Sequence, residues 1–177
     1  FCFTIKLLNS LYGEPFMKKE HFEKVRQALD TFDEGYDYAY EYDSMLHDYN
    51  GFILYQAESQ FIRKVGDEPG ITITELSVFF DKTKSACSQL MYRMKKKNLL
   101  KQVRNEHNNR EYNLYLTDKG QQLYQFHKIF EDGCYRRTAE MLSSFTMEEL
   151  ETYIKIQKKM NEAFLLDVNE SKERNIR

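Results

Sequence analysis

Apolar residues recur at helical spacing in the stretch FFDKTKSACSQLMYRMKKKNLL, residues 79–100. They fall at i, i+3, i+4 and i+7, which places them on one stripe of an α-helix. These residues are Cys87, Leu90, Met91 and Met94. Thr83 can cap the start of the helix with its hydroxyl, and Asn98 suits the left-handed conformation that ends helices. The pattern predicts a helix over about 84–97 with one apolar and one polar face.

A shorter helix precedes this one. Thr72 and Glu75 have the spacing of a capping box, in which each side chain accepts a hydrogen bond from the other residue's backbone. Its apolar face holds Ile73, Leu76 and Phe80. Residues 81–82 then turn the chain into the second helix. Two short helices joined by a tight turn, the second of them basic, are typical of a helix-turn-helix.

Beyond Asn98 the period of the pattern changes from helical to alternating. Tyr112, Leu114 and Leu116 alternate with two other residues, as in a half-buried strand. The residues at 108–109 are both Asn, which favours a turn. The stretch therefore predicts two strands around a polar tip, and a basic hairpin directly after a helix-turn-helix is typical of a wing.

Further helices are predicted at about 18–32, 36–49, 52–65, 118–142 and 147–165. The tyrosines at 36–42 alternate as in a strand, but a helical stripe in the same stretch favours a helix. Thr117 can cap the fourth of these helices, and Thr146 with Glu149 forms a second capping box before the fifth. The sequence predicts a mainly α fold with a small β-hairpin wing, of the α+β class.

Charge along the 177 residues is uneven, although the formal net charge is only −2. Residues 82–110, which we call the basic window, hold nine Lys or Arg and one acidic residue, for a net charge of +8. A patch of this kind attracts polyanions even on a slightly acidic protein. We therefore expect the polar face of the second helix to enter a DNA major groove, which is wide enough for a helix, with Lys95, Lys96 and Lys97 near phosphates.

Twelve residues on these elements are the candidate DNA-binding residues. They are Thr72, Lys82, Thr83, Lys84, Ser85, Ser88, Gln89, Arg93, Arg104, Asn108, Asn109 and Arg110.

The ordered motifs resemble the MarR family of winged-helix transcriptional regulators. EPGITITELSVFFDKTKSACSQLMYRMKKKNLL looks like the family's helix-turn-helix, and NNREYNLYLTDKG looks like its wing. The family's wing pattern is Asp-x-Arg followed by Leu-Thr-x-x-Gly, and here Arg110, Leu116, Thr117 and Gly120 match it. Asn108 stands where the family has Asp, so the usual carboxylate–arginine pair would be absent. RNEHNNRE is also similar to the wing of the SarA-type branch.

The resemblance covers roughly 50–165 and implies an obligate homodimer on a pseudo-palindromic double-stranded operator. Residues 1–65 would then be dimerisation helices, 66–117 the winged DNA-binding lobe, and 118–177 further dimerisation helices. Many members release DNA on binding a small phenolic compound or on cysteine oxidation, and a few sense zinc. The function implied is a DNA-binding regulator, most simply a repressor, with a small aromatic compound as one candidate effector.

Several side chains allow two readings. Cys87 on the apolar stripe reads as a core residue, whereas basic neighbours of Cys134 could make it redox-active. A zinc site combining His127 with Cys134 or nearby carboxylates is the alternative to ordinary histidines. No spacing typical of a metal site occurs in the sequence, and no cofactor is expected. The tyrosines at 36–42 suit interface packing, and the alternative is an aromatic-ligand pocket.

No enzyme motif is present, and we expect a protein that is not an enzyme. The sequence has no apolar run of membrane-spanning length and its start lacks signal-peptide features, so we also expect no membrane association. Three cysteines without metal spacing favour a reduced, cytoplasmic protein. The alternative function is a winged-helix protein-interaction scaffold that does not bind DNA, although a scaffold has no need for the basic window.

Overall fold

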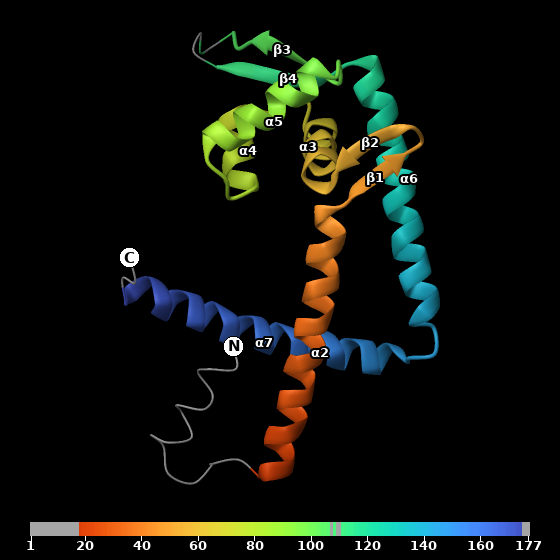
Figure 1. Cartoon of the computed structure of the whole chain (residues 1–177), viewed down its shortest axis with the longest axis vertical. Coiled ribbons are helices and arrows are strands. Elements are labelled where there is room, and N and C mark those ends of the chain that lie inside the picture. Colours follow the sequence, from red (N-terminus) through yellow and green to blue (C-terminus); the bar gives the residue numbers. More distant parts are fainter. Residues whose placement is uncertain (1–17, 107, 109–110, 175–177) are drawn as a thin grey trace. The chain divides into compact units, whose positions relative to one another are not determined.

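The computed structural model describes residues 18–106, 108 and 111–174. The elements are α2 (Lys19–Ser44), β1 (Leu46–Tyr49), β2 (Phe52–Tyr55), α3 (Gln56–Asp67), α4 (Ile73–Phe79), α5 (Lys84–Lys96), β3 (Leu100–Arg104), β4 (Tyr112–Leu116), α6 (Asp118–Met141) and α7 (Met147–Glu173). Figure 1 shows them along the chain. The chain divides within α6 into two compact units, one ending at His127 and one beginning at Lys128. This is the predicted mainly α architecture, with a second small hairpin.

The helix-turn-helix forms as its capping signals predict. The Thr72 hydroxyl accepts a hydrogen bond from the Glu75 N–H at 3.3 Å, and the Glu75 carboxylate accepts one from the Thr72 N–H at 2.8 Å. The Thr83 hydroxyl accepts from the Ala86 N–H at 3.1 Å and starts α5. Asn98 has φ of 58°, so α5 ends in the left-handed conformation predicted for this residue. The capping bonds start α4 and α5, and the left-handed backbone of Asn98 ends α5.

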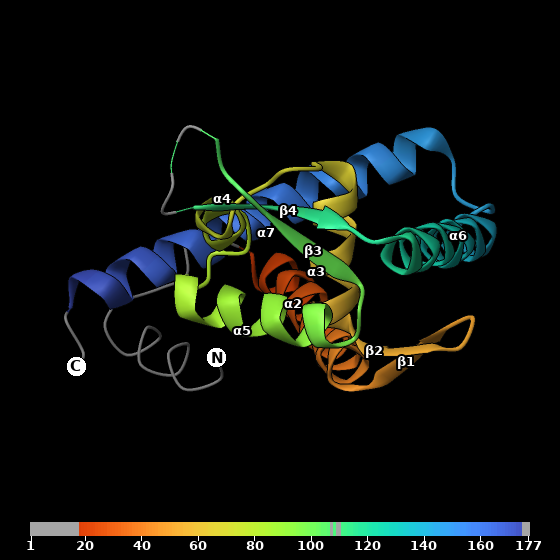
Figure 2. The same ribbon diagram turned by 90° about the horizontal axis from the view of Figure 1, so that it is seen from above.

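The wing is an antiparallel pair in which Leu100 faces Leu116 and Arg104 faces Tyr112. We call α3, α4, α5, β3 and β4 the winged lobe. Figure 2 shows the hairpin of β3 and β4 alongside α4 and α5, as seen from above. Thr72 also forms a bridge with Asn113, which joins the start of α4 to the wing.

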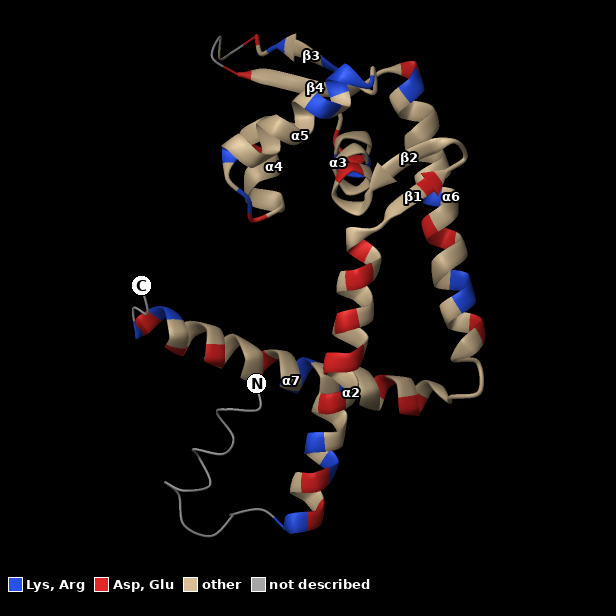
Figure 3. Cartoon of the chain, in the orientation of Figure 1, with Lys and Arg blue, Asp and Glu red and all other residues tan. Residues whose placement is uncertain are grey.

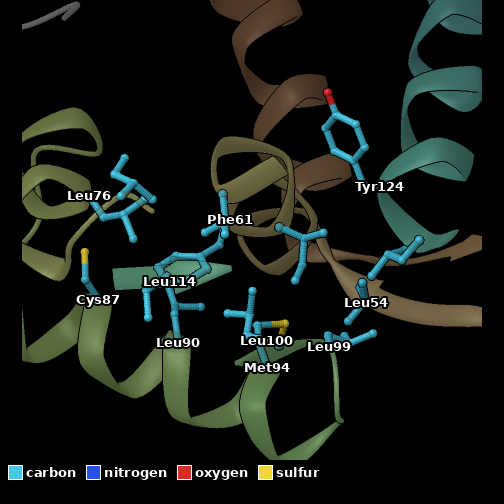
Figure 4. Close-up of a cluster of buried hydrophobic side chains, with 14 of the residues drawn as sticks. Leu54, Phe61, Leu76, Cys87, Leu90, Met94, Leu99, Leu100, Leu114 and Tyr124 are labelled. Carbon is cyan, nitrogen blue, oxygen red and sulfur yellow. The ribbon is translucent and has the colours of Figure 1, made fainter. Parts of the chain in front are cut away.

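One apolar core holds the winged lobe together. The stripe of α5 points into it, with Cys87 and Met94 fully buried and Leu90 nearly so. Figure 4 shows these side chains directed toward others from α3, α4 and the wing. Those partners include Phe61, Leu76, Leu99, Leu100 and Leu114. Because the apolar stripe of α5 is buried in the core of the lobe, the opposite face of the helix must point outward.

The predictions for 36–49 and 52–65 are wrong where the structure has a hairpin. The helix α2 ends at Ser44, and 46–49 is β1. The second stretch begins as β2, and its helix starts only at Gln56. Asn50 and Gly51 both have positive φ, at 55° and 88°, which is the backbone that a two-residue hairpin turn requires. This turn lets 46–49 pair with 52–55 in place of continuing a helix.

Alternation along this hairpin buries one of its faces. His47 and Tyr49 of β1 and Leu54 of β2 are buried, whereas Leu46, Ile53 and Tyr55 are exposed. The Tyr49 hydroxyl donates a hydrogen bond to the Ser59 hydroxyl at 3.1 Å, and its ring lies 5.1 Å from that of His127. The hairpin thereby contacts both α3 and the first part of α6.

The C-terminal unit consists of the second part of α6 and α7. Thr146 and Glu149 form the predicted capping box at the start of α7. That helix continues to Glu173, beyond the predicted end at 165. No residue of α7 is buried within the described chain, and the same holds for α2. A search of the described helices finds none with the length and apolar character needed to cross a membrane.

Candidate nucleic-acid interface

The outward face of α5 brings together the residues predicted to read bases. Ser85, Gln89 and Tyr92 are exposed, and Ser88 is half-buried between them. With Arg93 they line a shallow hollow of about 440 Å³. Hydroxyl and amide groups of this kind can pair with base edges in a major groove. Tyr92, which is 65% exposed, was not among the candidate residues, although its place three residues after Gln89 on the polar face is a signal for it.

A second hollow, of about 360 Å³, lies where the start of α4, α5 and the wing meet. Its lining includes Thr72, Lys84, Ser88, Gln102 and Glu111. Three of the candidate residues therefore share one concave surface. The Thr72 hydroxyl is already engaged, because it donates to Glu75 at 2.8 Å and caps α4. Hydrogen bonds from the Thr72 N–H and hydroxyl hold the pKa of Glu75 below its ordinary value, so that carboxylate stays ionised at neutral pH.

Side-chain hydrogen bonds near the tip of the wing join its two strands and connect the wing to α4. Asn108, in place of the family's Asp, donates from Nδ2 to Glu111 at 3.0 Å. Glu111 in turn accepts a hydrogen bond from the Thr74 hydroxyl of α4 at 3.3 Å. Asn105 donates to Asn113 across the hairpin at 2.8 Å. Asn108 is therefore held by a carboxylate in the wing itself, while Asn109 and Arg110 lie outside the described residues.

Cations surround the outward face of α5. Lys82, Lys84, Lys96 and Lys101 are exposed and form no ion pair with a described residue, and Arg104 is also exposed. Lys95 is exposed and donates to the neutral Gln102 amide oxygen at 2.7 Å, which leaves its charge uncompensated. Figure 3 shows Lys and Arg gathered on α5 and β3, whereas the middle of α2 is acidic. The basic window thus forms a charged surface and is not merely a run in the sequence.

Two cations at the C-terminal end of α5, Arg93 and the C-cap residue Lys97, behave differently. Arg93 Nε lies 3.4 Å from Glu58 Oε1, and Lys97 Nζ lies 2.9 Å from Glu58 Oε2. The Glu58 side chain is only 5% exposed, so the two cations compensate a buried carboxylate of α3. The sequence pattern placed Arg93 and Lys97 toward DNA and did not indicate this arrangement. Glu58 lies 35 and 39 residues before its partners, too far for any local pattern to pair them.

The cysteines and histidines fall into separate settings. Cys87 is fully buried, as predicted for a core residue, and desolvation raises the pKa of its thiol. Cys134 is partly exposed, with Arg137 Nη2 3.8 Å from its sulfur, so its proposed redox role stays a prediction. His127 is 3% exposed, and burial, followed by the nearby Arg63 charge, lowers its pKa to about 4. Among the described residues, no group of three His, Cys, Asp or Glu side chains could hold a metal ion.

The tyrosines of α2 point outward within the single chain. Tyr36, Tyr38 and Tyr40 are 61%, 65% and 71% exposed. Neither the predicted interface packing nor the alternative aromatic-ligand pocket is tested by one chain. Asp43, near the end of α2, does line a small hollow of about 220 Å³ with Gln60 of α3, Leu90 of α5 and Phe80, which directly follows α4.

Comparison with known proteins gives matches only at the level of structure. No family model and no curated protein sequence matches the chain. FabT from Streptococcus pneumoniae, solved in complex with DNA, is 18% identical with a TM-score of 0.61 over 83% of this chain and 99% of its own. ZitR from Lactococcus lactis, a zinc-responsive MarR family member, is 16% identical with a TM-score of 0.67 over 79% and 99%. The adhesin competence repressor AdcR from Streptococcus pyogenes is 16% identical with a TM-score of 0.59 over 79% and 97%.

Proposed function

We propose that this chain, whose fold is the winged-helix fold of the MarR-family regulators, binds double-stranded DNA and regulates transcription. One observation carries the proposal. The apolar face of α5 is buried in the core of the lobe, while its outward face exposes Ser85 and Gln89 in a surface edged by uncompensated lysines. That FabT, a protein of the same fold, was solved with DNA gives further support.

The chemistry of the surface divides between base reading and phosphate binding. Gln89 and the neighbouring hydroxyls can donate to and accept from base edges, which specify sequence. The lysines can neutralise phosphates, which set affinity and register without reading sequence. The wing, held to α4 through Glu111 and Thr74, would lie against the backbone beside the groove.

We propose that the protein acts as a homodimer and represses transcription by occupying its operator. The exposed apolar residues of α2 and α7 support a dimer, because a partner would cover them: among others Tyr36, Tyr40, Ile154, Leu165 and Leu166. A mass near that of one 21.3 kDa chain by light scattering at micromolar concentration would contradict the dimer. Release by a small aromatic compound or by cysteine oxidation is part of the same proposal, and adding each to a DNA-bound sample tests it.

The test of DNA binding is selection of duplexes from a random library, followed by a gel shift with the selected and a scrambled duplex. The proposal predicts an enriched motif with two-fold symmetry and tighter binding to the selected duplex. A scaffold that does not use DNA would enrich no motif and shift neither duplex. A promoter–reporter assay with the selected motif then distinguishes repression, which we expect, from activation.

A further inference from the structure

The clasp formed by Glu58, Arg93 and Lys97 has no part in the proposed reading of DNA, yet it uses two cations on the DNA-facing helix. The two partners approach opposite oxygens of one carboxylate, at 3.4 Å for Arg93 and 2.9 Å for Lys97. The backbone N–H of Tyr55 also donates to Glu58 Oε2, at 3.4 Å. A carboxylate that is almost completely buried needs such partners, because leaving it uncompensated is strongly unfavourable.

We infer that Glu58 is a positioning residue that takes the place of a phosphate: it holds Arg93 and Lys97 against α3 and thereby withholds their charge from DNA. The inference rests on the proposed function, since it concerns which cations of α5 reach the DNA backbone. Arg93 and Lys97 keep 53% and 43% of their side chains exposed. They can therefore reach a phosphate near the surface once the carboxylate no longer holds them.

Withholding cations has a consequence for nonspecific binding. A phosphate contact strengthens binding to every sequence equally, because it carries no sequence information. If α5 and its C-cap engaged all of their cations with phosphates, nonspecific binding would rise, and the ratio of specific to nonspecific affinity would not improve. The clasp instead fixes the second half of α5 to α3 and leaves Lys84, Lys96 and Lys101 for the backbone. The Glu58 carboxylate thus both orients α5 and keeps two of its neighbouring cations away from phosphates.

Replacement of the carboxylate by an amide makes the inference measurable. Glu58→Gln removes the negative charge with little change in shape and frees two cations. Each added phosphate contact makes the slope of log affinity against log salt concentration more negative by about 0.9. One added contact therefore contributes a factor of about eight to the gain in affinity between about 1 M and about 0.1 M salt. We expect Glu58→Gln to bind a scrambled duplex severalfold more tightly and with a slope steeper by one to two units per bound lobe. A role limited to folding would change stability and leave this slope unchanged.

The control for charge and capping is Glu149→Gln. Glu149 is also the third residue of a capped helix, and it accepts from Thr146 and lies in the other compact unit. Its replacement removes one negative charge from the chain without freeing a cation of α5. We expect its salt slope to match that of the wild type. A slope that steepens as much as in Glu58→Gln would mean that net charge alone is responsible, and would overturn the inference.

The decisive comparison is between two neighbouring lysines in two backgrounds. Lys96 forms no ion pair with a described residue, so Lys96→Gln should make the slope shallower by about one unit in both the native and the Glu58→Gln background. Lys97→Gln should make it shallower by about one unit only in the Glu58→Gln background. Titrations of labelled scrambled duplex at several salt concentrations measure all of these, after circular dichroism has shown each variant to be folded.

The outcomes separate this inference from the proposed function. A wild-type protein that binds no duplex overturns both. A wild type that binds with a steep slope, together with a Lys97→Gln protein that loses a full unit in the native background, overturns the inference alone. That second comparison uses no Glu58 variant, so it decides the matter even if Glu58→Gln does not fold.

Discussion

Two glycines of α6 should respond in opposite directions to the same substitution. A Cβ added at Gly120 would lie 2.0 Å from the carbonyl oxygen of Leu99 and 3.4 Å from Leu116 Cβ. That oxygen cannot simply move away, because it accepts a hydrogen bond from the Thr117 N–H at 3.1 Å. A Cβ at Gly133 would meet no atom within 4 Å. The pair thus compares close packing with an open helix position.

The magnitudes follow from two terms. Gly→Ala inside a helix stabilises by about 1 kcal/mol, and both variants receive this gain. Overpacking against a fixed backbone costs about 1–3 kcal/mol or more, and the approach at Gly120 is far inside normal contact distance. We expect Gly133→Ala to be more stable than wild type by up to about 1 kcal/mol. Gly120→Ala should be less stable than wild type by about 2 kcal/mol, which is the upper overpacking cost less the helix gain.

Urea unfolding followed by circular dichroism, at one fixed protein concentration, measures both free energies of unfolding. Because Leu99 directly precedes β3, Gly120→Ala should also weaken DNA binding by disturbing the base of the wing. Equal stabilisation of the two variants would refute the reasoning, since it would show that α6 does not begin against the Leu99 carbonyl. The glycine of the Leu-Thr-x-x-Gly pattern would then have no steric cause.

Two further results are expected. Gln89→Ala should cost about 1–3 kcal/mol on the selected duplex and much less on a scrambled one, because base contacts specify; equal losses in the two titrations would show that Gln89 does not read bases. Buried His127, with its pKa lowered to about 4, binds a proton more readily in the unfolded chain, so the stability it contributes is complete above about pH 6.5 and is lost as the pH falls toward 4. In urea unfolding at a series of pH values, His127→Phe should therefore lose less stability than wild type between these limits, and parallel curves would contradict the assignment.

Local signals accounted for the parts of the fold that the sequence predicted well. The caps at Thr72, Thr83 and Thr146 depend on residues within three positions, and each forms as expected. Asn98 likewise ends α5 through its own backbone preference. The second strand of the wing follows from the alternation of Tyr112, Leu114 and Leu116. Elements whose ends are decided by their nearest neighbours can be recognised without knowledge of the fold.

The first hairpin shows how one local signal can mask another. Asn50-Gly51 is a strong hairpin turn signal, but Met45, Leu46 and Tyr49 also fit a helical stripe, which predicts a helix. Burial decides between them, because pairing of β1 with β2 places His47, Tyr49 and Leu54 against the core. The stability of the hairpin depends on contacts with α3 and α6, which short-range spacing does not encode.

The candidate site was predicted in its composition but not in its internal contacts. The outward face of α5 follows directly from the apolar stripe, so Ser85, Ser88 and Gln89 were placed together correctly. Which cations are available to a partner depends on tertiary packing, and the clasp on Arg93 and Lys97 could not be seen without it. The same holds for Glu111, whose bonds to Asn108 and Thr74 join the wing to α4.

The central claim is that the surface formed by α5 and the basic window binds the phosphate backbone of double-stranded DNA. The salt dependence of affinity for a duplex tests it most directly, because each neutralised phosphate adds about −0.9 to the slope of log affinity against log salt. With several exposed lysines on each lobe, a dimer should give a slope steeper than about −4. A slope near zero would show that the basic window does not touch DNA, and would contradict the claim.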